Sequence, residues 1–287
     1  MSASVTRPVL RYHGGKWLLA PWVIENMPMH RTYVEPFGGG ASVLLRKERS
    51  LGECYNDLDG SIVNVFRVLQ DPEKAAALQR RMIFTPFARA EFTRCYEPAL
   101  DDVDGACKTI AMSFMGYGTD TATRKGTSGF NVKISDSGDF HSNAWAGWPD
   151  CVPDFIDRLR GVVIEQRDAK VIMARLDSEE TFFFVDPPYV ISTRSSKVKK
   201  GDGHGYRHEM SNADHVELAK TMHSLQGMIL LAGYPSALYG ELYADWHHIE
   251  RSHLSYLGKK STECLWFNAA AWERRPQRQM FAGQVGR

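Results

Sequence analysis

The sequence predicts an α/β fold with a mainly parallel sheet covered by helices on both faces. Two observations support it: strand-like apolar runs alternate with helical patterns from residue 9 to about 70, and the same alternation returns after residue 160. A third observation concerns the segment between them, which is first helical and then rich in glycine, serine and threonine. With 287 residues, 43% of them hydrophobic, the chain can bury a large core. We therefore expect a sheet that is split in the sequence by an inserted, mostly helical module.

The first half of the predicted sheet contains two strands and two helices. "RTYVEPFGGG" (31–40) predicts a strand that runs into a glycine turn, and 41–50 fits a helix. A short strand is expected over 51–57, followed by a helix over 60–70 whose apolar residues fall at helical spacing. Asp71-Pro72 opens the next helix, because proline is tolerated in a first helical turn.

The predicted insert begins with helices over about 72–82, 88–97 and 102–115. Residues 115–140 then contain few core residues and many glycines, serines and threonines, which indicates loop and hairpin structure. The pair Trp145 and Trp148 is expected in the core of the insert.

The second half of the sheet is predicted from five further apolar runs. These expected strands are "GVVIEQ" (161–166), "TFFFVD" (181–186), "GMILLAG" (227–233), "HHIER" (247–251) and "ECLWFN" (263–268). Helices are expected near 170–177, 211–226 and 235–244, and a poorly ordered basic tail over 273–287.

Composition restricts the class of protein only moderately. The formal net charge is +1, so any basic surface for nucleic acid must be local. The five cysteines are scattered, without the spacing of metal ligands, and predict free thiols in a reducing compartment. No signal peptide and no apolar run of 18 residues is found, so we expect a soluble, intracellular protein that contacts no membrane.

The most informative stretch is the end of the strand at "TFFFVDPPY" (181–189). Prolines 187 and 188 fix the backbone and leave the sheet rigidly, so Asp186 and Tyr189 are presented at the carboxyl end of the strand. Ligands bind at that edge in open α/β sheets. The alternative is an ordinary turn, for which Asp-Pro-Pro is also typical.

Two more features fall at the same predicted edge. The turn "EPFGGGAS" (35–42) lets backbone approach a ligand closely, and it is not a phosphate-binding P-loop because no Gly-Lys-Ser/Thr follows. Asp57 ends the next strand, where a carboxylate suits the hydroxyls of a ribose. The alternatives are a simple tight turn, and an acid that caps the helix near Gly60.

Lys16 and Asp168 complete the pattern. Lys16, after two glycines in "LRYHGGKW", either meets a carboxylate or is a solvated surface residue. Asp168, after the third strand, lies near an adenine ring or caps the following helix. Because all these groups follow parallel strands or face their ends, they predict a nucleoside pocket with a reaction centre beside it.

Taken together, these residues resemble a known family, the Dam-type DNA adenine-N6 methyltransferases. The stretches that carry the resemblance are "RYHGGKW" (11–17), "YVEPFGGGASVLL" (33–45), "NDLDGSIVNVF" (56–66), "RKGTSGFNV" (124–132), "FFVDPPY" (183–189) and "TECLWFN" (262–268). They occur in the family's order and span nearly the whole chain.

The resemblance implies the fold, the reaction and the partners. It implies a Rossmann-like methyltransferase domain formed by 1–70 and 161–287, and a target-recognition domain over 71–160. The implied enzyme transfers a methyl group from S-adenosylmethionine, leaving S-adenosylhomocysteine, to the N6 amino group of an adenine flipped out of double-stranded DNA. It implies no required metal, a monomer or weak dimer, and action in the cytoplasm of a bacterium or phage-infected cell, as in restriction-modification.

The resemblance also assigns roles to residues. The implied catalytic residues are Asp186, Pro187, Pro188 and Tyr189. The implied cofactor-binding residues are Tyr12, Lys16, Glu35, Pro36, Phe37, Gly38, Gly39, Gly40, Asp57, Asp168, Ala169 and Asp186. The DNA-contacting candidates are Tyr117, Arg124, Lys125, Asn131 and Lys133 in the insert, and Lys197, Lys199, Lys200 and Arg207 in the basic loop 192–208 that follows the "DPPY" strand.

Three positions depart from the family pattern. Ala41 stands where the last glycine of the turn is usual, and crowds the start of the helix. Ala169 replaces a phenylalanine, so aromatic packing on the adenine of the cofactor must come from elsewhere. Residues 133–135 read "KIS" instead of "PFG", which puts specificity for GATC in doubt.

Other readings of the sequence stay open. An N4-cytosine methyltransferase needs the same acceptors, but more often has serine where this chain has Asp186. A catalytically inactive DNA-binding homologue is a second alternative, which the intact Asp186 and Tyr189 disfavour. Methylation of RNA or of a protein glutamine is a third, which the DNA-like hairpin of the insert disfavours.

Overall fold

The computed structural model describes residues 5–118, 120–124, 126–132, 141–194, 205–254 and 260–276. Its centre is a seven-stranded sheet of order β3-β2-β1-β4-β5-β7-β6. The strands are β1 (Thr32–Glu35), β2 (Gly52–Asn56), β3 (Val163–Glu165), β4 (Thr181–Val185), β5 (Met228–Gly233), β6 (His247–Leu254) and β7 (Lys260–Phe267). The first five strands in the chain, β1 to β5, are parallel to one another, and β7 pairs antiparallel with both β5 and β6.

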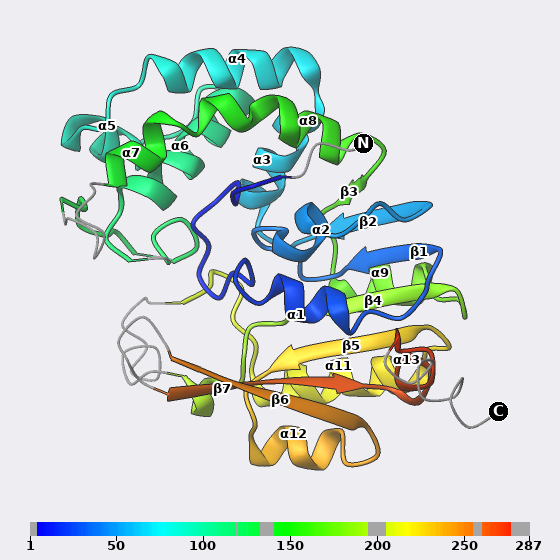
Figure 1. The fold of residues 1–287 in the computed structure, drawn as a ribbon. Helices are drawn as coiled ribbons and strands as arrows, with labels where there is room; N and C mark the ends of the chain where they lie inside the picture. The colour runs from blue at the N-terminus through cyan, green and yellow to red at the C-terminus, as the bar shows by residue number, and fades with distance from the viewer. Residues whose placement is uncertain are drawn as a thin grey trace.

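Helices surround this sheet (Figure 1). They are α1 (Ala20–Glu25), α2 (Ser42–Arg46), α3 (Gly60–Gln70), α4 (Pro72–Ile83), α5 (Arg89–Arg94), α6 (Asp102–Met115), α7 (His141–Ala146), α8 (Val152–Leu159), α9 (Ala169–Arg175), α11 (Asn212–Ser224), α12 (Ala237–Leu242) and α13 (Ala269–Glu273). Two short 3-10 turns are η1 (Pro149–Cys151) and η2 (Ile191–Thr193).

The alternation of side chains along the strands separates two cores. Tyr33 of β1 packs on one face with residues of α2, α3 and α13. Its neighbour Val34 packs on the other face with residues of α9, α11 and α12. Successive side chains of a strand point to opposite faces, so the continuous apolar run of β4 is buried on both. The predicted α/β class with a mainly parallel, doubly covered sheet is confirmed.

Helices α4 to α8 form a group at the end of the sheet where β3 and β2 lie, at the top of the view in Figure 1. Their buried side chains, such as Leu78, Ile110 and Phe155, share one continuous apolar cluster with Tyr33 and Tyr55 of the sheet. Trp145 and Trp148 belong to the same cluster, as the sequence predicted. The group is packed against the sheet, and its role as a separate target-recognition domain stays a prediction.

A buried ion network ties this group to the sheet. Glu53 of β2 accepts from Lys47 at 2.5 Å and from Arg158 of α8 at 2.7 Å, with all three side chains nearly inaccessible. Burial of two cations around one carboxylate is favourable only when the charges are paired closely. Burial opposes ionisation, but Arg158 and Lys47 lower the pKa of Glu53 overall.

The structure adds elements that the sequence patterns did not predict, namely α7, α8 and the short α13. Each is only five to eight residues long, which is shorter than the stretch over which helical periodicity can be recognised. Gly116 and Phe130 form an isolated antiparallel bridge in the stretch read as loop and hairpin. The remainder of that hairpin, 133–140, and the tail from 277 lie outside the described residues.

Two further expectations concern cysteines and membranes. All five cysteines are free, as their scattered spacing predicted. Among the residues that the structure describes, no helix combines the length and apolar character needed to cross a membrane.

Candidate active site

The carboxyl ends of the first four strands in the sheet meet at one cavity of about 460 Å³. Glu35 ends β1 and the glycine turn follows it, Asp57 follows β2, Asp168 follows β3, and Asp186 follows β4; all of them line this cavity. Its lining also contains Tyr12, Lys16, Pro36, Phe37, Gly38, Gly39, Gly40, Ala169 and Pro188. Parallel strands end at a common edge, so residues as far apart in the chain as Glu35 and Asp186 are brought together.

The glycine turn is held between two tyrosine rings. A Cβ atom on Gly38 would lie 2.2 Å from Cε2 of the buried Tyr55, and one on Gly39 would lie 2.7 Å from Cε1 of Tyr12. Gly39 also has a φ of +46°, which side chains rarely adopt. The hydroxyl of Tyr55 donates to the Gly39 carbonyl at 2.8 Å. This turn therefore requires glycine at both positions.

Ala41 stands in the left-handed region with φ of 52°, at the residue that caps α2. The sequence predicted that this alanine crowds the start of the helix. A non-glycine residue in this conformation costs about 1–2 kcal/mol. Its side chain is fully buried, so the strained backbone is held by surrounding packing.

Asp57 stabilises the glycine turn by accepting a hydrogen bond from its backbone. Its Oδ2 accepts from the Gly39 amide and its Oδ1 from the Asp59 amide, both at 2.8 Å. Burial raises its pKa, although both amide hydrogen bonds oppose that rise. The helix-capping role that was the alternative for Asp57 belongs to Asp59, which accepts from the Ser61 amide at the start of α3.

Asp168 caps the following helix, which was one of its two expected roles. Its Oδ1 accepts from the Lys170 amide at 2.8 Å and so caps α9. It also lines the cavity beside Ala169. Ala169 offers no aromatic surface there, but the cavity wall contains the apolar side chains of Leu58, Met210 and Leu218.

Asp186 forms a buried ion pair with Lys16. The Lys16 Nζ lies 3.0 Å from Asp186 Oδ2 and donates to the Gly14 carbonyl at 2.7 Å. Lys16 is only 6% exposed, so the alternative of a solvated surface lysine is wrong. The other oxygen, Asp186 Oδ1, is buried and has no hydrogen-bond partner among the described residues. One oxygen is thus fixed, and the other is an unused acceptor in a residue that lines the cavity.

Burial raises the pKa of Asp186 to about 6, with Lys16 opposing this rise. Burial disfavours the charge of Lys16 as well, but the nearby carboxylates Asp186 and Glu263 dominate and raise its pKa overall. The pair therefore consists of a permanent cation and a carboxylate that titrates close to neutral pH.

Tyr189 is held in place by three contacts. Its hydroxyl donates to Glu263 Oε2 at 2.8 Å, and its ring meets that of Tyr234 edge-on with centroids 4.7 Å apart. The Lys16 Nζ lies 4.6 Å from the centre of the Tyr189 ring. Tyr189 and the buried Pro187 do not line the cavity themselves but adjoin the residues that do.

The segment 205–210 closes one side of the cavity, which the sequence did not predict. The Tyr206 hydroxyl donates to the His13 carbonyl at 2.9 Å, over Gly14. Arg207 pairs with Asp59 at 3.0 Å, and Glu209 pairs with Arg194 at 2.8 Å. The only signal in the sequence was an aromatic residue inside a stretch whose positive charges suggested a DNA-contacting loop.

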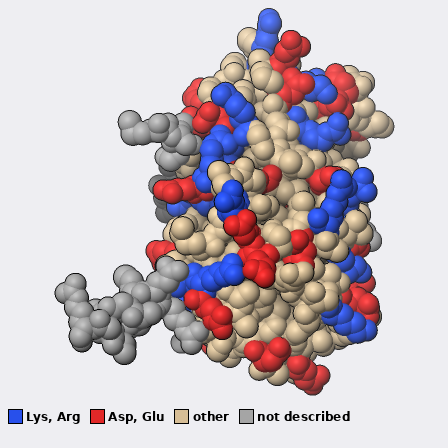
Figure 2. Space-filling view, turned by 90° about the vertical axis from the view of Figure 1, so that its right-hand side faces the viewer, with Lys and Arg blue, Asp and Glu red and all other residues tan. Residues whose placement is uncertain are grey.

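The DNA-contacting candidates are placed only in part. Lys125, Lys133, Lys197, Lys199 and Lys200 lie outside the described residues. Tyr117 is 53% exposed, whereas Asn131 is buried, and Thr123 beside Arg124 lines the cavity. The guanidinium of Arg207 faces Asp59, which lines the cavity, and Ser61. On the face in Figure 2, Lys and Arg are interspersed with Asp and Glu.

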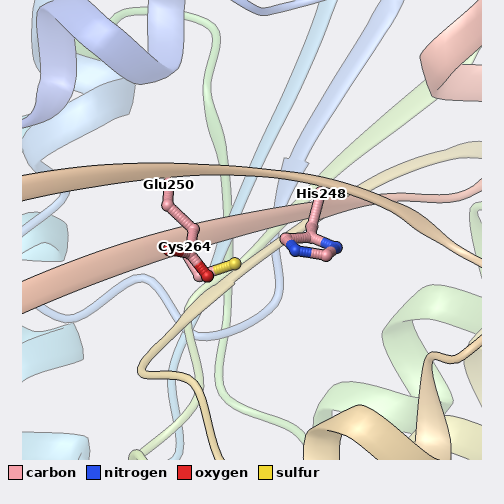
Figure 3. A group of neighbouring side chains, drawn as sticks. All are labelled: His248, Glu250 and Cys264. Carbon is pink, nitrogen blue, oxygen red and sulfur yellow. The ribbon is translucent and has the colours of Figure 1, made fainter.

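A separate group of possible metal ligands lies on β6 and β7 (Figure 3). Atoms of His248, Glu250 and Cys264 approach within 4.8 Å of one another. Burial raises the pKa of the Cys264 thiol to about 12, so the thiol must lose a firmly held proton before it binds an ion. The other two side chains are exposed and none of the three lines the cavity. We assign no ion to this group.

Comparisons with known proteins bear on the N-terminal part of this site. No curated protein sequence matches the chain. Residues 12–92 match the family model for the D12 class N6 adenine-specific DNA methyltransferase. The matched residues include Lys16, the glycine turn and Asp57, but not residues 186–189. Over this stretch the chain is therefore similar to the D12 class N6 adenine-specific DNA methyltransferases, which is consistent with the Dam-type family that the sequence motifs predicted.

Proposed function

We propose that this protein transfers a methyl group from S-adenosylmethionine to the N6 amino group of an adenine flipped out of double-stranded DNA. The observation that carries the proposal is that only one of the two carboxylate oxygens of Asp186 has a partner. Lys16 occupies one oxygen of this carboxylate, while the other is buried without a partner at the wall of a ligand-sized cavity. A buried acceptor that lacks a donor is costly, which is typical of groups reserved for a ligand.

The chemistry of adenine explains why such an acceptor is needed. The lone pair of the N6 amino group is delocalised into the ring, so the nitrogen is a poor nucleophile. Asp186 Oδ1 and the carbonyl of Pro187 are proposed to accept its two hydrogens, which favours a tetrahedral nitrogen with a localised lone pair. Because Lys16 and the prolines fix these acceptors beforehand, they stabilise the transition state without reorganising.

The cavity fits S-adenosylmethionine in size and in the nature of its walls. A volume of about 460 Å³ falls within the range of small-molecule sites. Phe37 and the glycine turn would hold the methionine part with Tyr12, Asp57 the ribose hydroxyls, and Asp168 the region of the adenine. When bound, the cofactor supplies a methyl group on a positively charged sulfur. The chain's own residues align that group with the amino nitrogen.

The DNA-binding part of the proposal uses residues beside the cavity. A base inside a duplex cannot reach Asp186, so the target adenine must be flipped out, at a cost of a few kcal/mol. Tyr189 is proposed to stack on the flipped base, and Arg124 to read a guanine edge. Helices α4 to α8, with the predicted hairpin between α6 and α7, would serve as the target-recognition domain. No recognition sequence is proposed, because the departure from the family pattern falls at residues 133–135.

A transfer assay tests the proposed function. The protein is incubated with labelled S-adenosylmethionine and unmethylated DNA, and the modified bases are mapped by sequencing. Label on the N6 of adenine at a defined site is expected. Label on the N4 of cytosine would replace the proposal by its nearest alternative, and the absence of transfer despite cofactor and DNA binding would favour an inactive homologue.

The rate of transfer is expected to fall as the pH falls through about 6. Burial raises the pKa of Asp186 to that value, and only the ionised carboxylate accepts at Oδ1 as proposed. The effect of Asp186 on stability has the opposite sign: its folded-state pKa lies above its ordinary value, so protonation favours the folded state. Loss of rate on acidification is therefore not caused by unfolding through Asp186.

Single-turnover rates between pH 5 and 8 would check this expectation. Glu35 lines the same cavity, and burial raises its pKa to about 7, so it is the group that must be separated from Asp186. In Asp186→Asn the decline near pH 6 should disappear from the residual activity. A decline that persists there would assign the titration to Glu35 or another group.

A further inference from the structure

Glu263 is a buried carboxylate beside the proposed reaction centre to which no role has been assigned. It lies on β7, is 5% exposed, and its Oε2 accepts the hydroxyl of Tyr189 at 2.8 Å. Its stretch, 262–268, contributes to the family resemblance, but lies outside the residues that the family model matches. A glutamate is rarely buried to this depth unless its carboxylate has a specific partner, which here is the Tyr189 hydroxyl.

The topology of the sheet brings Glu263 to this position. β7 pairs antiparallel with β5, so that Cys264 lies opposite Gly233 at the carboxyl end of β5. Tyr234 directly follows β5 and packs edge-on against Tyr189. The antiparallel strand therefore delivers a carboxylate to the same edge where the parallel strands deliver their acids.

The hydrogen bond to Glu263 sets the position of the Tyr189 hydroxyl, which also lies near the carboxylate of Asp186. Burial, followed by Asp186 and Glu263, raises the pKa of Tyr189 well above its ordinary value, so the hydroxyl keeps its proton and donates. If Glu263 were removed, the Tyr189 hydroxyl would lose this acceptor and be left with Asp186 as its nearby carboxylate, while Tyr234 and Lys16 still contact the ring.

We propose that Glu263 is a positioning residue for methyl transfer, which holds the Tyr189 ring in the orientation that receives the flipped adenine. The inference rests on the proposed function, since it gives a purpose to that orientation. Glu263 touches neither the target base nor the cofactor and acts through Tyr189. As a second carboxylate near Lys16, it also sets the charge around Asp186.

This second effect separates positioning from a merely structural role. The groups that bear on the ionisation of Asp186 are Lys16, Glu263 and Tyr189, and the charge of Glu263 is among the causes that raise its pKa. Neutralising Glu263 should lower the pKa of Asp186. A loss of packing alone would reduce the folded fraction but would not move the pH at which the rate declines.

Three variants and a matched control test the proposal. Glu263→Gln keeps the shape and an acceptor oxygen, Glu263→Ala removes both, and Tyr189→Phe removes the hydroxyl but retains the ring. Glu250→Gln removes an exposed carboxylate from the neighbouring strand β6 and should behave as the unaltered protein. Single-turnover transfer, cofactor affinity and thermal unfolding are measured for each.

Glu263→Ala is expected to lower the single-turnover rate by on the order of 10-fold, because a displaced stacking ring misaligns the base. Cofactor affinity should be unchanged. Glu263→Gln should lose less activity, and its decline on acidification should move to lower pH. In the Tyr189→Phe background, Glu263→Ala should cost less than it does alone, since the contact it breaks is already absent.

The outcomes distinguish this inference from the proposed function. If the unaltered protein transfers no methyl group, the proposed function fails. A double-mutant cycle of Glu263→Ala and Tyr189→Phe, measured by thermal unfolding, then still decides whether the two residues are energetically coupled, because it requires no activity. If the unaltered protein is active and Glu263→Gln and Glu263→Ala match Glu250→Gln in rate and pH profile, or if the unfolding cycle shows no coupling, the positioning role is refuted.

Discussion

Replacing Asp186 by alanine should lower the rate of methyl transfer by on the order of 10²-fold or more, while the cofactor still binds. The substitution removes the acceptor proposed for the target amino group and leaves the glycine turn and Asp57 intact. It also removes the carboxylate that pairs with Lys16, whose side chain is only 7% exposed. Lys16 retains the Gly14 carbonyl as an acceptor and has Glu263 nearby, which limits the loss of stability.

A paired substitution separates the lost acceptor from the lost charge. Asp186→Asn retains one acceptor oxygen and should keep more activity than Asp186→Ala. Asp150→Asn, at an exposed position outside the cavity lining, serves as the control and should match the unaltered protein. The rate is measured as transfer of labelled methyl groups in samples quenched at set times, and the cofactor affinity by a binding titration. Wild-type transfer by Asp186→Ala would refute the assignment of Asp186 to the reaction.

The grouping of the cavity residues was predictable because it depends on a local pattern and one rule of topology. An acid or a glycine turn after each apolar run is visible along the chain, and parallel strands place those positions at a common edge. Asp57, Asp168 and Asp186 therefore needed no knowledge of side-chain packing to be placed around one cavity. Once the chain forms a parallel sheet, the ends of its strands must lie at one edge, and these residues with them.

Contacts across the cavity were not predictable in the same way. Tyr189 and Glu263 are 74 residues apart, and Tyr206 reaches the His13 carbonyl across 193 residues. Such pairs depend on how the antiparallel strand β7 and the segment 205–210 dock, for which the sequence has no short-range signal. The ion pair of Lys16 with Asp186 was only one of two alternatives that the sequence left open. A lysine beside two glycines is compatible with contact to solvent or to a carboxylate.

Gly38→Ala should abolish productive cofactor binding through a single added methyl group. The new Cβ atom would lie 2.2 Å from the Tyr55 ring, far closer than a van der Waals contact. The ring has no room to retreat, because it packs on Phe66 with centroids 4.5 Å apart and its hydroxyl is bonded to the Gly39 carbonyl. The turn must then move toward the cavity. A displacement of about 1 Å is sufficient to reduce transfer by on the order of 10²-fold.

The same change should destabilise the fold by about 1–3 kcal/mol through overpacking. Gly240→Ala is the matched control: Gly240 lies in α12, its added Cβ would meet no atom within 4 Å, and the helix should gain about 0.5–1 kcal/mol. Cofactor titration and thermal unfolding on both variants provide the comparison. A Gly38→Ala protein that binds cofactor normally would show that the turn can yield elsewhere. Gly39 has a positive φ and is hydrogen-bonded to both Tyr55 and Asp57. The structure therefore predicts that the turn cannot shift to accommodate the added methyl group.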